Sequence, residues 1–187
     1  VLENTKTSRE YYMSKLTEEE MQIQTQIEEY KLQMAEVEIE IRKISGLKSF
    51  GENYAGGEMM WPIPGYTNIT SQYGMRTHPI TGLYSLHTGT DVSAPTGANF
   101  VAAASGVVVK AGYNKYYGNM VLIDHGGGVQ TLYAHGSEII AQLGELVAKG
   151  DVVLKVGSTG YSTGPHAHFE IRIDGDTVNP LDYIKPE

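Results

Sequence analysis

The sequence predicts a mainly β protein, α+β overall, in which one long N-terminal helix precedes an antiparallel β-sheet domain with long loops. Two observations lead to this prediction. Residues 7–45 contain no Gly or Pro and repeat their apolar side chains every seven residues, which is typical of a coiled-coil helix. After residue 60 the apolar side chains fall instead in short β-branched runs bounded by Gly, Asn, Asp or Pro, which is typical of strands joined by turns.

The helix is predicted from two rows of apolar residues, the first interrupted only by Glu20. The rows are Met13, Ile27, Met34 and Ile41, and Leu16, Ile23, Tyr30, Val37 and Ile44. At about 1.5 Å per residue such a helix is roughly 55–60 Å long, which exceeds the diameter of a small domain. We therefore expect residues 7–45 to pack against another helix, which could be the second copy in a homodimer, another part of the chain or a coiled-coil partner. The helix could also fold back over the second half of the chain, since the linker is long enough.

A change of composition at residue 46 sets the domain boundaries. Four glycines and few apolar residues fall between 46 and 60, as in a flexible linker. The run Trp61-Pro-Ile-Pro-Gly65 then marks the entry into a new domain. The sequence thus divides into a coiled-coil helix at 1–45, a Gly-rich linker at 46–60 and a β domain at 61–187.

The β domain is expected to consist of hairpins and long loops. Its strand-like runs are 107–109, 120–123, 129–133, 152–156 and 169–173. The turn residues at 148–151 predict a hairpin between 145–147 and 152–156, and residues 137–143 form at most a turn or two of helix.

Charge and cysteine content exclude several classes of function. The 187 residues carry a formal net charge of −8 and no basic patch, so nucleic acid is not an expected partner. The absence of cysteine excludes disulfides and thiolate metal sites. No apolar run reaches the length of about 18 residues that a transmembrane helix needs, so we expect no membrane span within this sequence.

Histidine is more informative, because five of the six histidines lie between residues 87 and 168. Two clusters stand out, His87-Thr-Gly-Thr-Asp91 and His166-Ala-His168. Residues two or four apart on a strand point to one face, so each cluster would direct two side chains the same way. A catalytic zinc site uses three protein donors and leaves a fourth position open, and these clusters with His135 hold more donors than that. Spacing alone does not decide which of His166 and His168 would bind the metal.

Longer motifs surround these histidines. They are Ser71-Gln-Tyr-Gly-Met-Arg76-Thr-His-Pro79, His87-Thr-Gly-Thr-Asp91, Tyr133-Ala-His135, the run Gly157–Glu170 that includes His166 and His168, and Val178-Asn-Pro-Leu181. With these motifs in this order, the sequence from about Trp61 to Ile184 resembles the lysostaphin-type, or LytM-type, zinc metallopeptidases. The N-terminal heptads lie outside the resemblance.

The resemblance implies a role for each residue of the two clusters. His87, Asp91 and His168 would be the metal ligands and would hold one Zn²⁺ per domain. The remaining two histidines, His135 and His166, would be the catalytic pair.

The resemblance also implies a function. Members of this family cut the peptide stems or cross-bridges of bacterial peptidoglycan, so we expect a zinc metalloendopeptidase acting outside the cytoplasm, in the cell wall, either secreted or tethered to the membrane through a preceding part. Some members have lost ligands, so the alternative is a catalytically silent scaffold or amidase activator of cell-wall remodelling in division or sporulation. All five site positions are present here, which favours an enzyme.

Three further residues are candidates for substrate contact: His78, Arg76 and Tyr133. Each also has an ordinary structural interpretation, because His78 and Arg76 fall in a predicted loop and a tyrosine in a strand more often packs than binds. His125 is interpreted as a turn residue.

One motif points to a different chemistry. Gly160-Tyr-Ser162-Thr-Gly164 has the G-x-S-x-G pattern of serine hydrolases. That fold requires a helix directly after the serine and a histidine later in the chain, whereas Pro165 follows here and no histidine comes after His168. We therefore discount a serine nucleophile.

Overall fold

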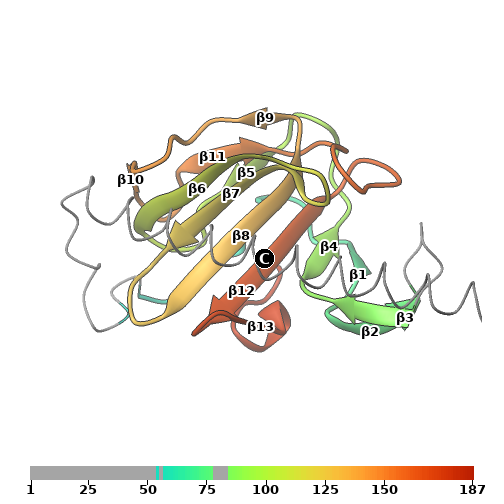
Figure 1. The fold of residues 1–187 in the computed structure, drawn as a ribbon, viewed down its shortest axis with the longest axis horizontal. Helices are drawn as coiled ribbons and strands as arrows, with labels where there is room; N and C mark the ends of the chain where they lie inside the picture. The colour runs from blue at the N-terminus through green and yellow to red at the C-terminus, as the bar shows by residue number, and fades with distance from the viewer. Residues whose placement is uncertain (1–53, 55–56, 78–83) are drawn as a thin grey trace, which may run out of the picture. The chain divides into compact units, whose positions relative to one another are not determined.

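The computed structural model describes residues 54, 57–77 and 84–187 (Figure 1). The predicted coiled-coil helix, its partner surface at 7–45 and most of the linker at 46–60 lie outside these residues and stay predictions. In the described part of the chain, all strand pairs are antiparallel and the one helical element is a short 3₁₀ helix, η1 (Pro180–Asp182). The predicted antiparallel β domain is therefore confirmed. No helix among the described residues has the length and apolarity needed to cross a membrane.

An antiparallel sheet of eight strands carries the site. Its order is β1-β4-β12-β8-β7-β6-β10, and β13 pairs with the second half of β12 beyond the part that pairs with β4. The strands are β1 (Ile69–Ser71), β4 (Thr90–Val92), β6 (Gly106–Asn114), β7 (Gly118–Asp124), β8 (Val129–Gly136), β10 (Leu146–Val147), β12 (Ala167–Ile173) and β13 (Asp176–Val178). Successive side chains on each strand point to opposite faces of the sheet.

One face of this sheet packs against a three-stranded sheet made of β5 (Asn99–Val101), β11 (Val152–Lys155) and β9 (Glu138–Ile139), as Figure 1 shows. Phe100, Tyr133 and Phe169 meet in the core between them, with ring centroids 5.0 Å apart for Phe100–Tyr133 and 5.5 Å for Tyr133–Phe169. Each such edge-to-face pair adds about 0.5–1.5 kcal/mol to the effect of burial. Tyr133 on β8 and Phe169 on β12 thus face the core, and the residues that alternate with them face the other side of the large sheet.

A separate hairpin brings further residues to the edge of the large sheet. It consists of β2 (Gly74–Thr77) and β3 (Tyr84–His87), with Gly74 opposite His87 and Arg76 opposite Ser85. The connection 78–83, which includes His78, lies outside the described residues.

One local prediction was wrong. The turn at 148–151 is present, with the Asp151 amide donating to the Ala148 carbonyl at 3.1 Å, but its flanks do not form a hairpin. Instead β10 pairs with β6 and β11 pairs with β5 and β9, because the chain passes from one sheet to the other at this turn. Residues 137–143 contain β9 and no helix, which agrees with the expected limit of a turn or two.

His125 lies in the turn after β7, as expected, but its side chain is fully buried. Its Nδ1–H donates to the Ser105 carbonyl at 2.9 Å, and its Nε2 lies 2.7 Å from Thr131 Oγ1. The Thr131 hydroxyl in turn lies 2.8 Å from the Tyr133 hydroxyl, which accepts from the Ala103 amide at 2.8 Å. Burial lowers the pKa of His125, so this network contains a neutral imidazole.

Candidate metal centre

Strand pairing brings together the three residues expected to bind metal. Asp91 on β4 lies directly opposite His168 on β12, and His87 at the end of β3 approaches both. His168 Nδ1 lies 2.7 Å from Asp91 Oδ1, His87 Nε2 lies 3.2 Å from the same oxygen, and the two ring nitrogens are 3.2 Å apart. All three side chains are buried. Two imidazole nitrogens and one carboxylate oxygen therefore converge on a single point.

His87 and Asp91 converge for a different reason from the one expected. They do not share a strand: β3 ends at His87 and β4 begins at Thr90, so the chain bends at Thr88 and Gly89. Gly89 is required at this bend, because a Cβ there would overlap the Phe169 carbonyl oxygen and lie 2.9 Å from His168 Cε1. The bend packs directly on β12.

The donor set fits a zinc ion. Two imidazoles and one carboxylate are ligands that zinc takes in catalytic sites, with a further position left open. The outer nitrogen of each ring is already engaged: His87 Nδ1–H donates to the Gln72 carbonyl at 2.8 Å, and His168 Nε2 lies 3.1 Å from Glu170 Oε1. Only the inner nitrogens, His87 Nε2 and His168 Nδ1, are left to face Asp91. The three donor atoms lie within 4.8 Å of one another.

The electrostatics of the centre favour a positive charge between its carboxylates. Burial raises the pKa of Asp91, but the contacts with His168 and His87 outweigh this and hold the pKa well below its usual range. Burial lowers the pKa of His168, yet its bonds to Asp91 and Glu170 outweigh burial and raise that pKa to about 9. A metal cation bound here would supply the positive charge that a proton on His168 otherwise supplies.

His135 and His166 lie beside the three donors. Their rings are 4.7 Å apart between centroids, and His166 Nε2 is 3.8 Å from Asp91 Oδ1. His135 has φ 60°, a left-handed conformation that costs a non-glycine residue about 1–3 kcal/mol and that concentrates at functional sites. Burial, with the nearby His168 and His166, lowers the pKa of His135 to about 4.

Backbone carbonyls fix the tautomers of both rings. His135 Nδ1–H donates to the Thr159 carbonyl and His166 Nδ1–H donates to the Gly164 carbonyl, each at 2.8 Å. A carbonyl oxygen only accepts, so Nδ1 carries the proton in both rings and Nε2 keeps its lone pair. Ser162 Oγ also lies 3.3 Å from His166 Nδ1, but that nitrogen has the closer carbonyl partner, so the ring does not activate the serine.

An open cleft of about 570 Å³ contains these groups. The five site residues all line it, together with Arg76 from the hairpin and the aromatic side chains of Tyr116, Tyr117 and Tyr161. Tyr116 and Tyr161 form an exposed edge-to-face pair with centroids 5.1 Å apart.

The three expected substrate contacts fall in different places. Arg76 lines the cleft, with Nη2 3.6 Å from Asp91 Oδ2. Tyr133 does not fit a substrate contact, because it is fully buried and its hydroxyl is engaged with Ala103 and Thr131. Its neighbour in sequence, Ala134, is the residue opposite His168, so Tyr133 points to the other face. His78 is outside the described residues.

Sequence reasoning assigned no role to Glu170, Thr88 or Tyr117. Glu170 is fully buried and bonds to His168, to the hydroxyls of Thr88 and Tyr117, and to Arg172. Burial raises the pKa of Glu170, but these partners, His168 first, lower it to about 2. The pattern H-x-E-x-R at residues 168–172 of β12 is the signal that could have identified Glu170, since alternate residues share a face.

A known protein family matches the part of the chain that holds these residues. The model of Peptidase family M23 matches residues 85–180. The chain is 49% identical over 131 residues to the DD-carboxypeptidase/endopeptidase Mpg of Neisseria meningitidis serogroup B, an alignment that covers 70% of this chain and 30% of that relative. The chain thus spans about a third of the length of that relative.

Two solved structures share the fold. A zinc-containing peptidase from Vibrio cholerae has a TM-score of 0.61 and 31% identity, over 74% of this chain and 41% of that one. The catalytic domain of lysostaphin from Staphylococcus simulans has a TM-score of 0.57 and 29% identity, over 63% of this chain and 91% of that one. These matches confirm the lysostaphin-type resemblance, and the chain belongs to Peptidase family M23.

Proposed function

We propose that this chain is a zinc metalloendopeptidase that hydrolyses peptide bonds in the stems or cross-bridges of peptidoglycan. The observation that carries the proposal is the complete site: three convergent donors within 4.8 Å, with two histidines of fixed tautomer beside them in an open cleft. The printed name of Mpg, a DD-carboxypeptidase/endopeptidase, supports the stem peptide as the substrate class.

In this proposal His87 Nε2, Asp91 Oδ1 and His168 Nδ1 would hold the zinc ion. Zinc bound there supplies a Lewis acid that polarises the scissile carbonyl and makes a water molecule more acidic. Asp91 contributes one negative charge and the rings none, so the ion keeps a net positive charge for this purpose. Arg76 lies on the far side of the Asp91 carboxylate and leaves Oδ1 free to face the rings.

In this proposal His135 and His166 transfer the proton of the attacking water molecule. Because Nδ1–H of each ring is held by a carbonyl, the Nε2 lone pairs of His135 and His166 are available to orient a water molecule and accept its proton. Once protonated, the same Nε2–H can donate to the developing oxyanion or to the leaving amine. The fixed Nδ1 bonds keep both rings in place while Nε2 changes its protonation state.

The alternative, a silent scaffold or amidase activator, does not need this arrangement. A scaffold has no use for a strained left-handed histidine or for two carbonyl-fixed tautomers beside an intact ligand set. These features therefore favour the enzyme over the scaffold.

The proposal is tested by incubating the purified protein with isolated peptidoglycan and zinc, and by identifying the released fragments by mass spectrometry. The wild-type protein should bind one zinc and release fragments cut at a peptide bond, whereas His168→Ala should do neither. Equal cleavage by His168→Ala would refute the ligand assignment. Absence of stoichiometric zinc at neutral pH, with no cleavage, would favour the scaffold.

We also propose that residues 61–187 form the metallopeptidase domain, after a coiled-coil helix at 1–45 and a linker at 46–60. Trp61 and Ile63 are buried in the same core as the sheets, which supports a domain start near residue 61. Because peptidoglycan lies outside the cytoplasm, the proposed substrate implies that the domain acts there. Comparing cleavage by chains with and without residues 1–50 tests whether the N-terminal segment restrains the enzyme: equal rates would exclude that role.

A further inference from the structure

A buried carboxylate lies behind the metal centre and takes no part in the proposed hydrolysis. Glu170 has no exposed surface, and a buried charge is costly unless it is paired and hydrogen-bonded. Here Oε1 faces His168 Nε2 at 3.1 Å and accepts from the Tyr117 hydroxyl at 2.9 Å and from the Thr88 hydroxyl. Oε2 accepts from both Nε and Nη2 of Arg172, at 2.9 and 2.6 Å. Every lone-pair direction of the carboxylate is used.

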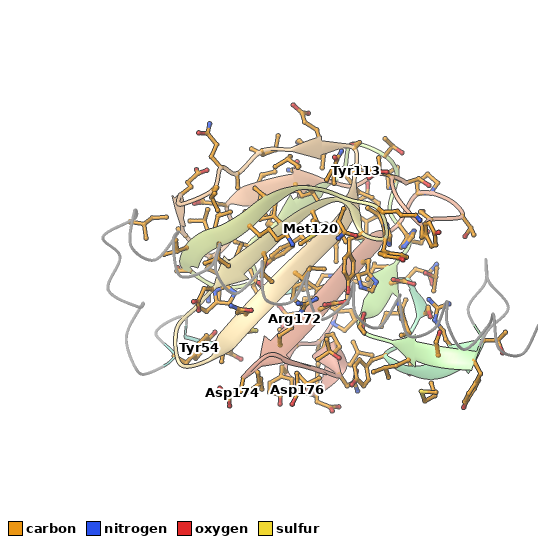
Figure 2. All side chains as sticks on the ribbon, in the orientation of Figure 1. Tyr54, Tyr113, Met120, Arg172, Asp174 and Asp176 are labelled. Atoms are coloured by element: carbon orange, nitrogen blue, oxygen red, sulfur yellow. The ribbon has the colours of Figure 1, made fainter. Side chains whose placement is uncertain are left out.

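These partners come from three separate parts of the chain. His168, Glu170 and Arg172 alternate along β12 and share one face of the strand (Figure 2 labels Arg172). Thr88 lies in the bend that follows His87, and Tyr117 precedes β7. Glu170 therefore joins the strand that holds one metal donor to the bend that joins the other two.

The contact with Glu170 determines which ring nitrogen of His168 can bind the metal. A carboxylate only accepts, so the Nε2 of a neutral His168 carries the proton, and the lone pair is left on Nδ1. Nδ1 is the atom that faces Asp91 Oδ1 and His87 Nε2. His87 has a neutral carbonyl as its outer partner, at Gln72, whereas His168 has an ionised carboxylate, which makes its ring the stronger donor.

Arg172 keeps Glu170 in this outer position. With the guanidinium on Oε2 and two hydroxyls on Oε1, the carboxylate has no oxygen left to bind the metal itself. We propose that Glu170, clamped by Arg172, Tyr117 and Thr88, is the positioning residue that sets the tautomer and orientation of His168 and thereby the zinc affinity of the site. This inference rests on the proposed zinc function.

The test replaces Glu170 with glutamine, which keeps the shape but has one acceptor oxygen in place of two. Either His168 Nε2–H or Arg172 then loses its acceptor. We expect the zinc affinity, measured by competition with a chromophoric chelator, to fall about 10–100-fold. The control Glu138→Gln makes the same chemical change at an exposed position on β9 and should leave the affinity unchanged.

Two smaller changes remove one donor each from Glu170. Tyr117→Phe and Thr88→Val should both lower the zinc affinity, but less than Glu170→Gln. The visible spectrum of the cobalt-loaded protein should also change in Glu170→Gln and not in Glu138→Gln, because the geometry of His168 changes. A role in folding alone would lower the melting temperature of the metal-free protein without these effects on the metal.

The outcomes separate this inference from the proposed function. A wild-type protein that binds no zinc would overturn both. Stoichiometric zinc in the wild type, with the same dissociation constant in Glu170→Gln, would overturn the role of Glu170 alone. If Glu170→Gln does not fold, unchanged dissociation constants in both Tyr117→Phe and Thr88→Val would overturn it.

Discussion

Gly89 separates two of the proposed zinc ligands, His87 and Asp91, and an alanine at this position tests how tightly the bend packs on β12. The added methyl group would overlap the Phe169 carbonyl oxygen and lie 2.9 Å from His168 Cε1 and 3.0 Å from Glu170 Cγ. The carbonyl belongs to a central strand and cannot move without disturbing its pairing with β4 and β8. The bend must therefore shift outward.

Overpacking of this kind costs about 1–3 kcal/mol. For a domain of this size a loss of about 2 kcal/mol lowers the melting temperature by roughly 5–10 °C. Because the shift also moves His87 and Asp91 away from His168, the zinc affinity should fall with it. Both quantities are measurable: the first by thermal denaturation with a chelator present, the second by zinc titration.

Gly112 provides the matched control. It lies on β6, an added Cβ there would meet no atom within 4 Å, and its backbone needs no left-handed conformation. Gly112→Ala should leave the melting temperature unchanged or raise it slightly, since alanine restricts the unfolded chain. If Gly89→Ala melted at the same temperature as Gly112→Ala and bound zinc equally well, the close packing of the bend on β12 would be refuted.

Four further predictions follow from the contacts described above. Removing zinc with a chelator should lower the melting temperature of the wild type but not of His168→Ala, since a ligand at about 1,000 times its dissociation constant stabilises the fold by about 4 kcal/mol. The free energy of unfolding should decrease as the pH falls below 6.5, because His125 takes up a proton there in the unfolded chain, whereas burial lowers its pKa in the folded chain. In zinc-saturated samples this decrease should be smaller for His125→Gln than for the wild type. Tyr133→Phe should cost about 1–3 kcal/mol by leaving the Ala103 amide without its acceptor, while cleavage per folded molecule stays constant; lost cleavage at full stability would instead indicate a substrate contact. His135→Gly should be more stable than His135→Ala by about 1 kcal/mol, because the left-handed backbone conformation at this position is unfavourable for alanine but not for glycine. The control Ala134→Gly should instead be less stable than the wild type.

The regular part of the fold was predictable because strands carry a local signal. The β-branched runs at 107–109, 120–123 and 169–173 all lie within strands of the large sheet. The partner of each strand was not predictable in the same way. The turn at 148–151 has ordinary hairpin chemistry, yet its flanks separate into two sheets, because pairing depends on contacts with residues far away in sequence.

The four histidines and the aspartate of the candidate site were predictable, but their geometry and the buried Glu170 behind them were not. The two clusters identified four residues, and the resemblance divided them into ligands and catalytic groups. The strand rule placed Asp91 correctly on a strand but gave the wrong reason for its meeting with His87, which depends on the bend at Gly89. Tyr133 is two residues from His135, and residues two apart on a strand would share a face. Tyr133 faces the core through its regular pairing opposite Phe169, whereas His135 leaves the regular strand geometry and lines the cleft.

Two of the proposed metal donors and the proposed catalytic pair are thus held by different kinds of structure. Asp91 and His168 face each other through regular strand pairing, which the packed core behind β8 and β12 stabilises. His135 and His166 are instead held by irregular backbone, through a left-handed residue and two loop carbonyls. Strand pairing tolerates loop changes, whereas a carbonyl bond to a ring does not. Changes in the 158–165 loop should therefore impair proton transfer before they impair zinc binding, and the two functions of the site can be lost separately.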